Sequence, residues 1–365
     1  MNTPIPRPGV LKVSPYIGGE SSIPGVTRII KLASNEGALG PSPKAVEASG
    51  GTADSLCRYP DGSCAALRER IGALHGLDPQ RLTCGAGSDE LLAIIGRGYV
   101  GVGDEVLASQ YGFLMYAILA TALGAAPVLA PERNLTADVD ALLARVTAKT
   151  RVVFLANPNN PTGTYLPFSE IRRLHAGLPG NVLLVLDAAY AEYMTAADYR
   201  AGVELVDDSE NVVMTRTFSK IYALGGLRLG WCYGPPAVID VINRVRGPFN
   251  VATPAQQVAL AALDDQPFID KVREHTARWR EWTTRALRDL GLTVPDSVGN
   301  FVLARFPSAA EADAADAALR RQGIIVRKMA GYGLAESLRI TIGTEEEMRS
   351  LVDGMAAFLG DRVPA

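Results

Sequence analysis

The residues with the clearest chemical potential form the segment Thr215-Arg216-Thr217-Phe218-Ser219-Lys220, which Arg228 follows. A buried lysine with a lowered pKa can form a Schiff base with an aldehyde cofactor. Arg228 can pair with a phosphate group as a planar fork, and the Ser219 hydroxyl can add a donor. Taken alone, this segment favours the simpler interpretation of a surface Ser-Lys pair beside a structural arginine.

Two further polar segments follow strands that the sequence predicts at 151–156 and 182–186. They are Asn157-Pro158-Asn159-Asn160-Pro161-Thr162-Gly163 and Asp187-Ala188-Ala189-Tyr190. A turn explains the first segment, and an aspartate that caps a loop explains the second. However, three polar sites at the carboxyl ends of buried parallel strands fall where such sheets bind ligands.

The set matches the requirements of pyridoxal 5′-phosphate (PLP). A carboxylate must keep the pyridine nitrogen protonated so that the ring acts as an electron sink, and Asp187 suits that role. Asn160 and Tyr190 suit the ring oxygen as neutral donors, and Lys220 suits the Schiff base. The residues therefore indicate a PLP site.

The elements that must position these residues are expected to form a doubly wound α/β domain. The runs at 151–156, 182–186 and 212–215 are continuously apolar, which is typical of strands buried on both faces of a mostly parallel sheet. Shorter strands are expected at 105–108 and 127–130. Helices, which complete βαβ units, are expected at 64–77, 89–100, 111–123 and 137–146.

The C-terminal part mixes helices and strands and predicts a smaller α+β domain. Its helices are expected at 254–263, 267–290, 309–322 and 345–359, and its strands at 301–306, 324–327 and 338–342. We expect three parts: an N-terminal segment at 1–47 that packs with the small domain, a large PLP-binding domain at 48–250, and a small domain at 251–365.

Composition excludes several classes of protein. The 365 residues carry a formal net charge of -3 without clustered Lys or Arg, which argues against nucleic-acid and membrane-surface partners. Four cysteines without a Cys-x-x-Cys pair and three scattered histidines predict neither disulfides nor a metal site. No apolar stretch has the length of a signal peptide or membrane span, so we expect a cytoplasmic protein.

From Pro15 to Gly343, the order of the motifs resembles the fold-type I aminotransferases. The resemblance implies that Lys220 is the Schiff-base lysine and also moves the proton between Cα and C4′. It implies that Asp187 pairs with the pyridinium, and that Tyr190 and Asn160 hold the ring oxygen. The cofactor phosphate is then bound by Ser219 and Arg228.

Three further segments gain roles from the same resemblance. In Gly85-Ala86-Gly87-Ser88-Asp89-Glu90, the backbone N–H groups of Gly87, Ser88 and Asp89 would face the phosphate at a helix N-terminus, although a simple helix start capped by Ser88 fits equally well. Phe113 would stack on the ring, with Tyr111 as the second choice, unless either is a core aromatic. Tyr59 would reach the phosphate of a neighbouring subunit, which implies a homodimer with shared active sites, unless it is a packed loop tyrosine.

Within this group, the chain most resembles the histidinol-phosphate aminotransferase family. The resemblance rests on segments such as Lys31-Leu32-Ala33-Ser34-Asn35-Glu36, Arg246-Gly247-Pro248-Phe249-Asn250-Val251 and Leu338-Arg339-Ile340-Thr341-Ile342-Gly343. It implies the exchange of an amino group between histidinol phosphate and 2-oxoglutarate, which yields imidazole acetol phosphate and glutamate. The expected substrate-binding residues are Tyr16, Asn35, Arg327 and Arg339, although Arg327 also fits a solvated strand-end charge.

The chain departs from the family pattern in two places. It has Asn35-Glu36-Gly37-Ala38 where the family usually reads Asn-Glu-Asn-Pro, and Asp187-Ala188-Ala189-Tyr190 where the family often reads Asp-Glu-Ala-Tyr. Three alternatives stay open: an aminotransferase for aromatic amino acids, a PLP-dependent decarboxylase of a phosphorylated amino acid, and a non-catalytic PLP-binding domain. The lack of an appended DNA-binding segment argues against the third.

Overall fold

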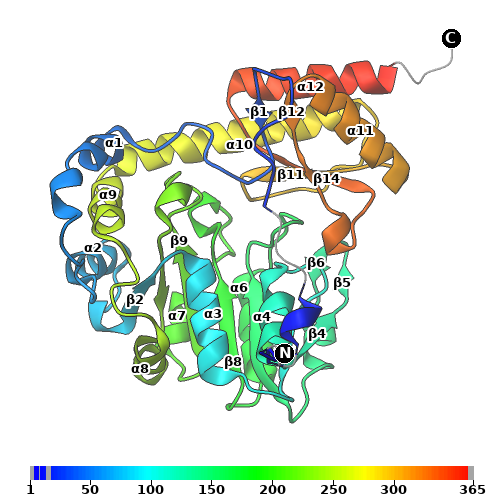
Figure 1. The fold of residues 1–365 in the computed structure, drawn as a ribbon. Coiled ribbons are helices and arrows are strands. Elements are labelled where there is room, and N and C mark those ends of the chain that lie inside the picture. The colour runs from blue at the N-terminus through cyan, green and yellow to red at the C-terminus, as the bar shows by residue number, and fades with distance from the viewer. Residues whose placement is uncertain (1–3, 8, 14–17, 361–365) are drawn as a thin grey trace.

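A seven-stranded sheet forms the centre of the computed structural model, which describes residues 4–7, 9–13 and 18–360 (Figure 1). Its order is β2-β10-β9-β8-β7-β3-β4. The strands are β2 (Leu82–Gly85), β3 (Glu105–Ser109), β4 (Ala126–Ala130), β7 (Thr150–Ala156), β8 (Leu183–Asp187), β9 (Val212–Thr217) and β10 (Gly230–Tyr233). The strands β9, β8, β7, β3 and β4 run parallel, and β10 is antiparallel to both of its neighbours.

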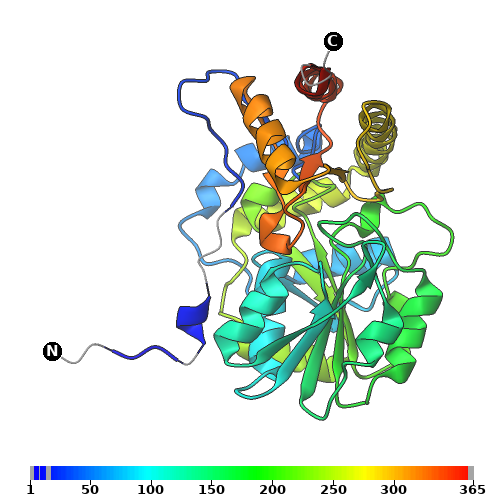
Figure 2. The ribbon, with the colours of Figure 1, turned by 90° about the vertical axis from the view of Figure 1, so that its right-hand side faces the viewer.

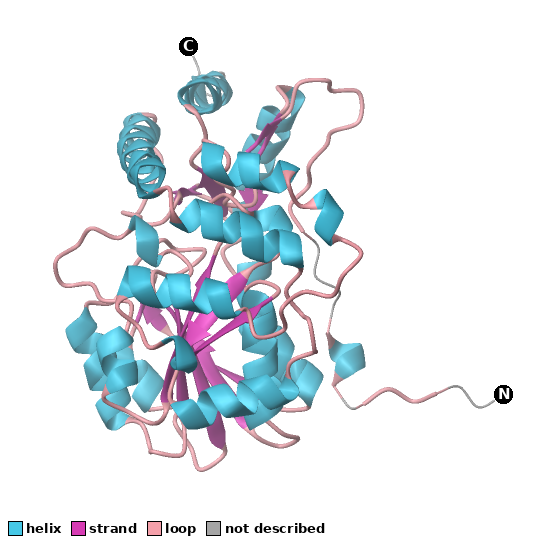
Figure 3. Cartoon of the chain, turned by 90° about the vertical axis from the view of Figure 1, so that its left-hand side faces the viewer, coloured by secondary structure: helices cyan, strands magenta, loops and turns pink. Residues whose placement is uncertain are grey.

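Helices cover both faces of this sheet. The helices α3 (Ser88–Tyr99), α4 (Met115–Leu123) and α8 (Pro236–Val245) share one apolar cluster with alternate strand residues such as Phe154 and Val185. The intervening strand residues belong to a second cluster, with the helices α2 (Ala65–His75), α5 (Val139–Leu143), α6 (Phe168–Gly177), α7 (Val203–Asp207) and α9 (Thr253–Leu263). Because side chains alternate along a strand, the two clusters lie on opposite faces, as a doubly wound sheet requires. Figure 3 shows the helices that surround the strands of this sheet.

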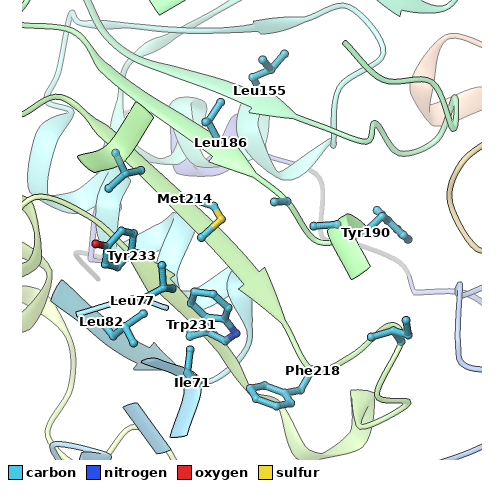
Figure 4. Packing of buried hydrophobic residues seen from close by; sticks show 14 of the residues in the cluster. Ile71, Leu77, Leu82, Leu155, Leu186, Tyr190, Met214, Phe218, Trp231 and Tyr233 are labelled. Carbon is cyan, nitrogen blue, oxygen red and sulfur yellow. The ribbon is translucent and has the colours of Figure 1, made fainter. Parts of the chain in front are cut away.

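The second cluster packs tightly beneath the carboxyl ends of the strands. Met214 of β9 and Leu186 of β8 pack near Trp231 of β10, and Ile71 of α2 lies against the same group (Figure 4). Each of these side chains is buried, and full burial of a large apolar side chain contributes about 1.5–3 kcal/mol. The strand ends that carry polar residues are therefore held in fixed positions.

The C-terminal elements stand above the large sheet (Figure 2). A three-stranded antiparallel sheet has the order β11-β14-β13. The elements of this part are α10 (Gln266–Asp289), β11 (Phe301–Arg305), α11 (Ala309–Arg321), β12 (Ile324–Ile325), β13 (Arg327–Lys328), β14 (Ser337–Thr341) and α12 (Glu345–Gly360). The long helix α10 runs from the side of α9 to the side of α12 (Figure 1).

The N-terminal segment joins the two regions. Strand β1 (Ile30–Lys31) pairs in parallel with β12, and α1 (Pro43–Gly50) lies beside α9. The hairpin β5 (Glu132–Arg133) and β6 (Thr136–Ala137) follows β4. Short 3-10 helices lie at Val10–Lys12, Ala53–Ser55, Pro79–Arg81, Ala191–Tyr193, Gly225–Leu227 and Ala330–Tyr332. None of the helices among the described residues is both long and apolar enough to cross a membrane.

Some predicted elements have other boundaries in the structure. The helix expected at 111–123 begins at Met115, because the Gly112 N–H bonds to the Ser109 carbonyl and closes a turn after β3. The strand expected at 324–327 divides into β12 and β13, which pair with different sheets. The helix expected at 137–146 shortens to α5, which begins after its N-cap Asp138. The division of the chain at residues 47 and 250 stays a prediction.

Candidate active site

A cavity of about 290 Å³ lies at the carboxyl ends of β7, β8 and β9. Because these strands are parallel and paired in register, Ala156 and Asp187, the last residues of β7 and β8, lie side by side, and Thr215, two residues before the end of β9, lies beside Asp187. The cavity brings together most residues that the sequence singles out. Those that line it are Asn35, Ser88, Asp89, Phe113, Asn160, Asp187, Tyr190, Ser219, Lys220, Arg228, Arg327 and Arg339.

Asp187 is a buried carboxylate at the last position of β8. Its Oδ2 accepts a hydrogen bond of 2.8 Å from the Tyr116 hydroxyl, and its Oδ1 accepts one of 3.4 Å from the Thr215 hydroxyl. Burial raises the pKa of Asp187 to about 6, although the bond from Tyr116 opposes the rise. Within residues 18–360, no cationic side chain forms a salt bridge with this carboxylate.

Sequence reasoning missed Tyr116 and Thr215 as partners of Asp187. Tyr116 belongs to α4 and is stacked on Phe154, with ring centroids 4.8 Å apart. From the sequence alone, it is typical of a core aromatic residue in an apolar helix. Its hydroxyl is the only sequence signal, since a buried phenol needs a hydrogen-bond partner. The Tyr116 and Thr215 hydroxyls orient the Asp187 carboxylate but supply no positive charge. The carboxylate therefore still favours a cationic group of a ligand.

Tyr190 lies just beyond Asp187 and is almost fully buried. Its hydroxyl accepts a 2.8 Å hydrogen bond from Asn35 Nδ2, and the Lys220 amine lies 5.7 Å from the centre of its ring. Burial raises the pKa of Tyr190 to about 12, whereas Arg339 and the bond from Asn35 lower it. The phenol therefore keeps its proton near neutral pH and serves as a neutral group of the cavity wall.

Arg339 connects the small sheet to the loop after β7. From β14, its Nη1 donates a 2.5 Å hydrogen bond to Asn160 Oδ1, and its Nη2 donates a 2.8 Å bond to the Ala33 carbonyl. The guanidinium also lies over the Phe301 ring at 5.5 Å. Arg327 lines the same cavity from β13, so two guanidinium groups reach the end of the cavity nearest the small sheet.

The opposite end of the cavity has the features of an anion site. Helix α3 begins there, and its N-cap is Gly87 at φ 92, so the alternative in which Ser88 caps the helix is wrong because Ser88 is the first helical residue. Arg228 lies against this glycine: an added Cβ at Gly87 would come within 2.5 Å of Arg228 Nη2. Arg228 Nη1 also donates a 3.5 Å hydrogen bond to Ser219 Oγ. The Gly87 N–H, which was predicted to face the phosphate, donates instead to the Gly85 carbonyl, and Arg228 Nη2 lies 3.5 Å from Asp89 Oδ2. The N–H groups of Ser88 and Asp89 at the start of α3 and the Arg228 guanidinium are therefore the groups that can attract a phosphate.

The two aromatic residues that were predicted as candidates for stacking on the ring, Phe113 and Tyr111, lie in different places. Phe113 lines the cavity from the turn before α4, whereas Tyr111 is not among the lining residues and packs in a separate cluster with Leu334 and Met329. Tyr332, which the sequence did not indicate, also lines the cavity. The shortened α4 explains the placement of Phe113, because a turn rather than a helix carries the residue.

Tyr59 lies apart from the cavity within one chain. Tyr59 is 83% exposed and stacks on Phe249 with ring centroids 4.9 Å apart, so the alternative of a packed loop tyrosine does not fit its exposure. Tyr16 lies outside the described residues. Among those residues, no group of three His, Cys, Asp or Glu side chains is placed to hold a metal ion.

Gly37, the first departure from the family pattern, lies behind the lysine loop. A Cβ atom added to Gly37 would lie 2.6 Å from the Ala223 Cβ and 3.4 Å from the Lys220 carbonyl oxygen. Its neighbour Glu36 lines the cavity and forms a 2.9 Å hydrogen bond with Lys31. The glycine thus allows close packing of the two loops, and any other residue at this position would require the Lys220 loop to shift.

Comparisons with known proteins agree with this geometry. The family model for aminotransferase class I and II matches residues 27–355. Curated histidinol-phosphate aminotransferases of Paramagnetospirillum magneticum and Rhodospirillum rubrum are each 58% identical to the chain, over 99% and 98% of its length and 100% and 97% of theirs. The crystal structure of histidinol-phosphate aminotransferase from Sinorhizobium meliloti, in complex with pyridoxal-5′-phosphate, has a TM-score of 0.86 at 29% identity and 91% coverage of both chains.

Proposed function

Because the chain belongs to the aminotransferase class I and II family, we propose that it is a PLP-dependent histidinol-phosphate aminotransferase of histidine biosynthesis. It transfers the amino group of L-histidinol phosphate to 2-oxoglutarate and forms imidazole acetol phosphate and L-glutamate. The observation that carries this proposal is 58% identity to curated histidinol-phosphate aminotransferases over nearly the whole chain. A cytoplasmic location stays a prediction.

The residues present fit the cofactor. Asp187 is a buried carboxylate without a cationic partner in the described part of the chain, and a protonated pyridine nitrogen would supply that charge. The helix start at Gly87, together with Ser219 and Arg228, suits a phosphate group. Asn160 and Tyr190 suit the ring oxygen, and Phe113 suits the ring face. Bound PLP supplies an electron sink that weakens the bond between the substrate Cα and its hydrogen.

The chain's own residues provide attachment, proton transfer and substrate binding. The Lys220 amine would hold the cofactor and, as a free amine, would move the proton between Cα and C4′. Asp187 keeps the pyridine nitrogen protonated. Arg339 and Arg327 bind the phosphate or carboxylate groups of the two alternating substrates, because guanidinium forks suit both.

The substrate is tested by a single-turnover titration of the purified enzyme with PLP. L-Histidinol phosphate and L-glutamate should both convert the cofactor to its amino form, and histidinol phosphate should do so at a concentration at least about tenfold below that needed for L-phenylalanine. A tenfold difference corresponds to about 1.4 kcal/mol, which one added guanidinium–phosphate contact can provide. Preference for phenylalanine would instead assign an aromatic aminotransferase, and release of CO2 from L-glutamate or L-phenylalanine would refute transamination.

We further propose a homodimer whose partner contacts Tyr59. Tyr59 and Phe249 form an exposed stacked pair, and Leu56 and Val46 expose further apolar surface, 68% and 56% respectively, in the same stretch of chain. Large aromatic side chains of this kind are enriched in protein interfaces. In such a dimer, we propose that the Tyr59 hydroxyl contacts the phosphate bound by the partner.

Two Tyr59 variants separate its roles. Tyr59→Phe should keep the dimer but weaken PLP binding about three- to tenfold, because it removes only a hydroxyl bond to the phosphate. Tyr59→Ala, which also removes apolar contact area, should raise the dissociation constant of the dimer. Sedimentation at several protein concentrations measures the mass, and equilibrium titration measures PLP affinity. A wild-type enzyme that sediments as a 38.7 kDa monomer would contradict the proposal.

A further inference from the structure

Asn35 is held at the junction between the N-terminal segment and the small sheet. Its backbone adopts φ 54, and its side chain and backbone are almost fully buried. The Asn35 N–H donates a 2.9 Å hydrogen bond to the Thr341 hydroxyl at the end of β14. Asn300 Nδ2, just before β11, donates a 3.0 Å bond to the Asn35 carbonyl. Asparagine tolerates this left-handed conformation better than most residues, so the position is specified by its backbone as well as its amide.

The Asn35 side chain forms a relay between Thr341 and Tyr190. The Thr341 hydroxyl accepts the Asn35 N–H and donates its own proton to Asn35 Oδ1 at 3.1 Å. This contact orients the amide so that Asn35 Nδ2 donates to the Tyr190 oxygen at 2.8 Å. The amide therefore faces Tyr190 with its NH₂ group rather than its oxygen.

The direction of this bond determines what Tyr190 can do with its own proton. The Tyr190 oxygen accepts from Asn35, so its O–H must point elsewhere. Within residues 18–360, the hydroxyl donates to no protein acceptor, and Tyr190 lines the cavity. Hydrogen bonds in a chain polarise one another, so the bond from Asn35 also makes Tyr190 a stronger donor.

We propose that Asn35 is a positioning residue: held by Thr341, it fixes the Tyr190 hydroxyl as a hydrogen-bond donor toward the cofactor ring oxygen. The inference rests on the proposed function, and it assigns to Asn35 and Thr341 a role that is separate from substrate binding. It also means that the small sheet, through β14, acts on the electronic state of a ring held by the large sheet. A displacement of β14 would weaken the donor without moving Tyr190 itself.

The test is the pH titration of the absorbance of the substrate-free enzyme with PLP. A donor to the ring oxygen stabilises its negative charge and so weakens its hold on the proton shared with the Lys220 nitrogen, which lowers the midpoint pH of the spectral change. Loss of the Tyr190 bond should raise that midpoint. We expect Asn35→Gly, which suits φ 54, to raise it by about 0.5 to 1 pH unit.

Matched variants separate the relay from a structural effect. Thr341→Val keeps the shape but removes the hydroxyl, and should raise the midpoint by about 0.5 pH unit, whereas Thr341→Ser keeps the hydroxyl and should leave it unchanged. Tyr190→Phe should raise the midpoint at least as far as Asn35→Gly. In the Tyr190→Phe background, Asn35→Gly should add no further rise, because both changes act through the same hydroxyl.

The outcomes distinguish this inference from the function on which it rests. An unchanged midpoint in Asn35→Gly with a raised KM alone would overturn it and make Asn35 only a substrate ligand. Equal shifts of Asn35→Gly with and without the Tyr190 hydroxyl would also overturn it. If Asn35→Gly does not retain PLP, the comparison of Thr341→Val with Thr341→Ser decides. A wild-type enzyme without any PLP absorbance would refute the proposed function instead.

Discussion

Lys220→Ala is expected to abolish the absorbance of covalently attached PLP and to lower the rate of amino transfer by about ten-thousand-fold or more. The amine has two roles, attachment of the cofactor and movement of the proton at Cα, and alanine supplies neither. Lys220 is the only lysine that lines the cavity among the described residues, so no neighbour can replace it. Single-turnover kinetics with L-histidinol phosphate and an absorbance spectrum measure the two losses together.

Stability distinguishes a chemical loss from a folding defect. Lys220 is half-buried in the loop after β9, and its removal leaves the apolar clusters on both faces of the sheet intact. The free energy of unfolding should therefore change by less than about 1 kcal/mol. Lys220→Arg serves as the control, because it keeps a positive charge but cannot form the Schiff base, and it should be equally inactive. An active Lys220→Ala enzyme would refute the mechanism.

Residues next to strand ends were predictable from sequence, whereas their supporting partners were not. Asp187, Asn160 and Lys220 each follow a continuous apolar run, so strand position and residue type together indicated a common edge of the sheet. Tyr116 reaches the site from α4, which is mostly apolar, and Thr341 reaches it from β14, where Arg339 was the residue that the sequence indicated. Only the folded structure brings the Tyr116 hydroxyl from α4 to Asp187 at the end of β8. In the same way, only the fold brings the Thr341 hydroxyl from β14 to the Asn35 amide.

The strands of the large sheet, too, could be predicted from the sequence only in part. The longest apolar runs became β7, β8 and β9 near their predicted bounds, because burial on both faces requires such runs. The antiparallel pair β2 and β10 was not predicted, since each has four residues and contains a glycine, Gly85 or Gly230. Gly230 is required by contact: an added Cβ would meet the Ser88 nitrogen at 2.4 Å.

Asp187→Asn is expected to stabilise the cofactor-free protein but to lower the rate of amino transfer. Burial raises the pKa of Asp187 from 3.8 to about 6, so the folded protein without PLP disfavours the charged form relative to the unfolded chain. This cost is absent below about pH 4, grows as the pH rises to about 6, and is complete above it. Asparagine removes the cost and keeps an acceptor for Tyr116, so the cofactor-free variant should gain up to about 3 kcal/mol at pH 8 but little at pH 4.

Activity should change in the opposite direction. A neutral amide cannot keep the pyridine nitrogen protonated, so amino transfer should fall about a hundredfold to a thousandfold although PLP still attaches to Lys220. Addition of PLP should also stabilise the wild type more than the variant, because only the carboxylate gains a cationic partner. Thermal unfolding at pH 4 and pH 8, with and without PLP, measures these differences. Normal turnover, or a cofactor-free variant less stable than the wild type at pH 8, would show that Asp187 is a structural residue and not the partner of the cofactor.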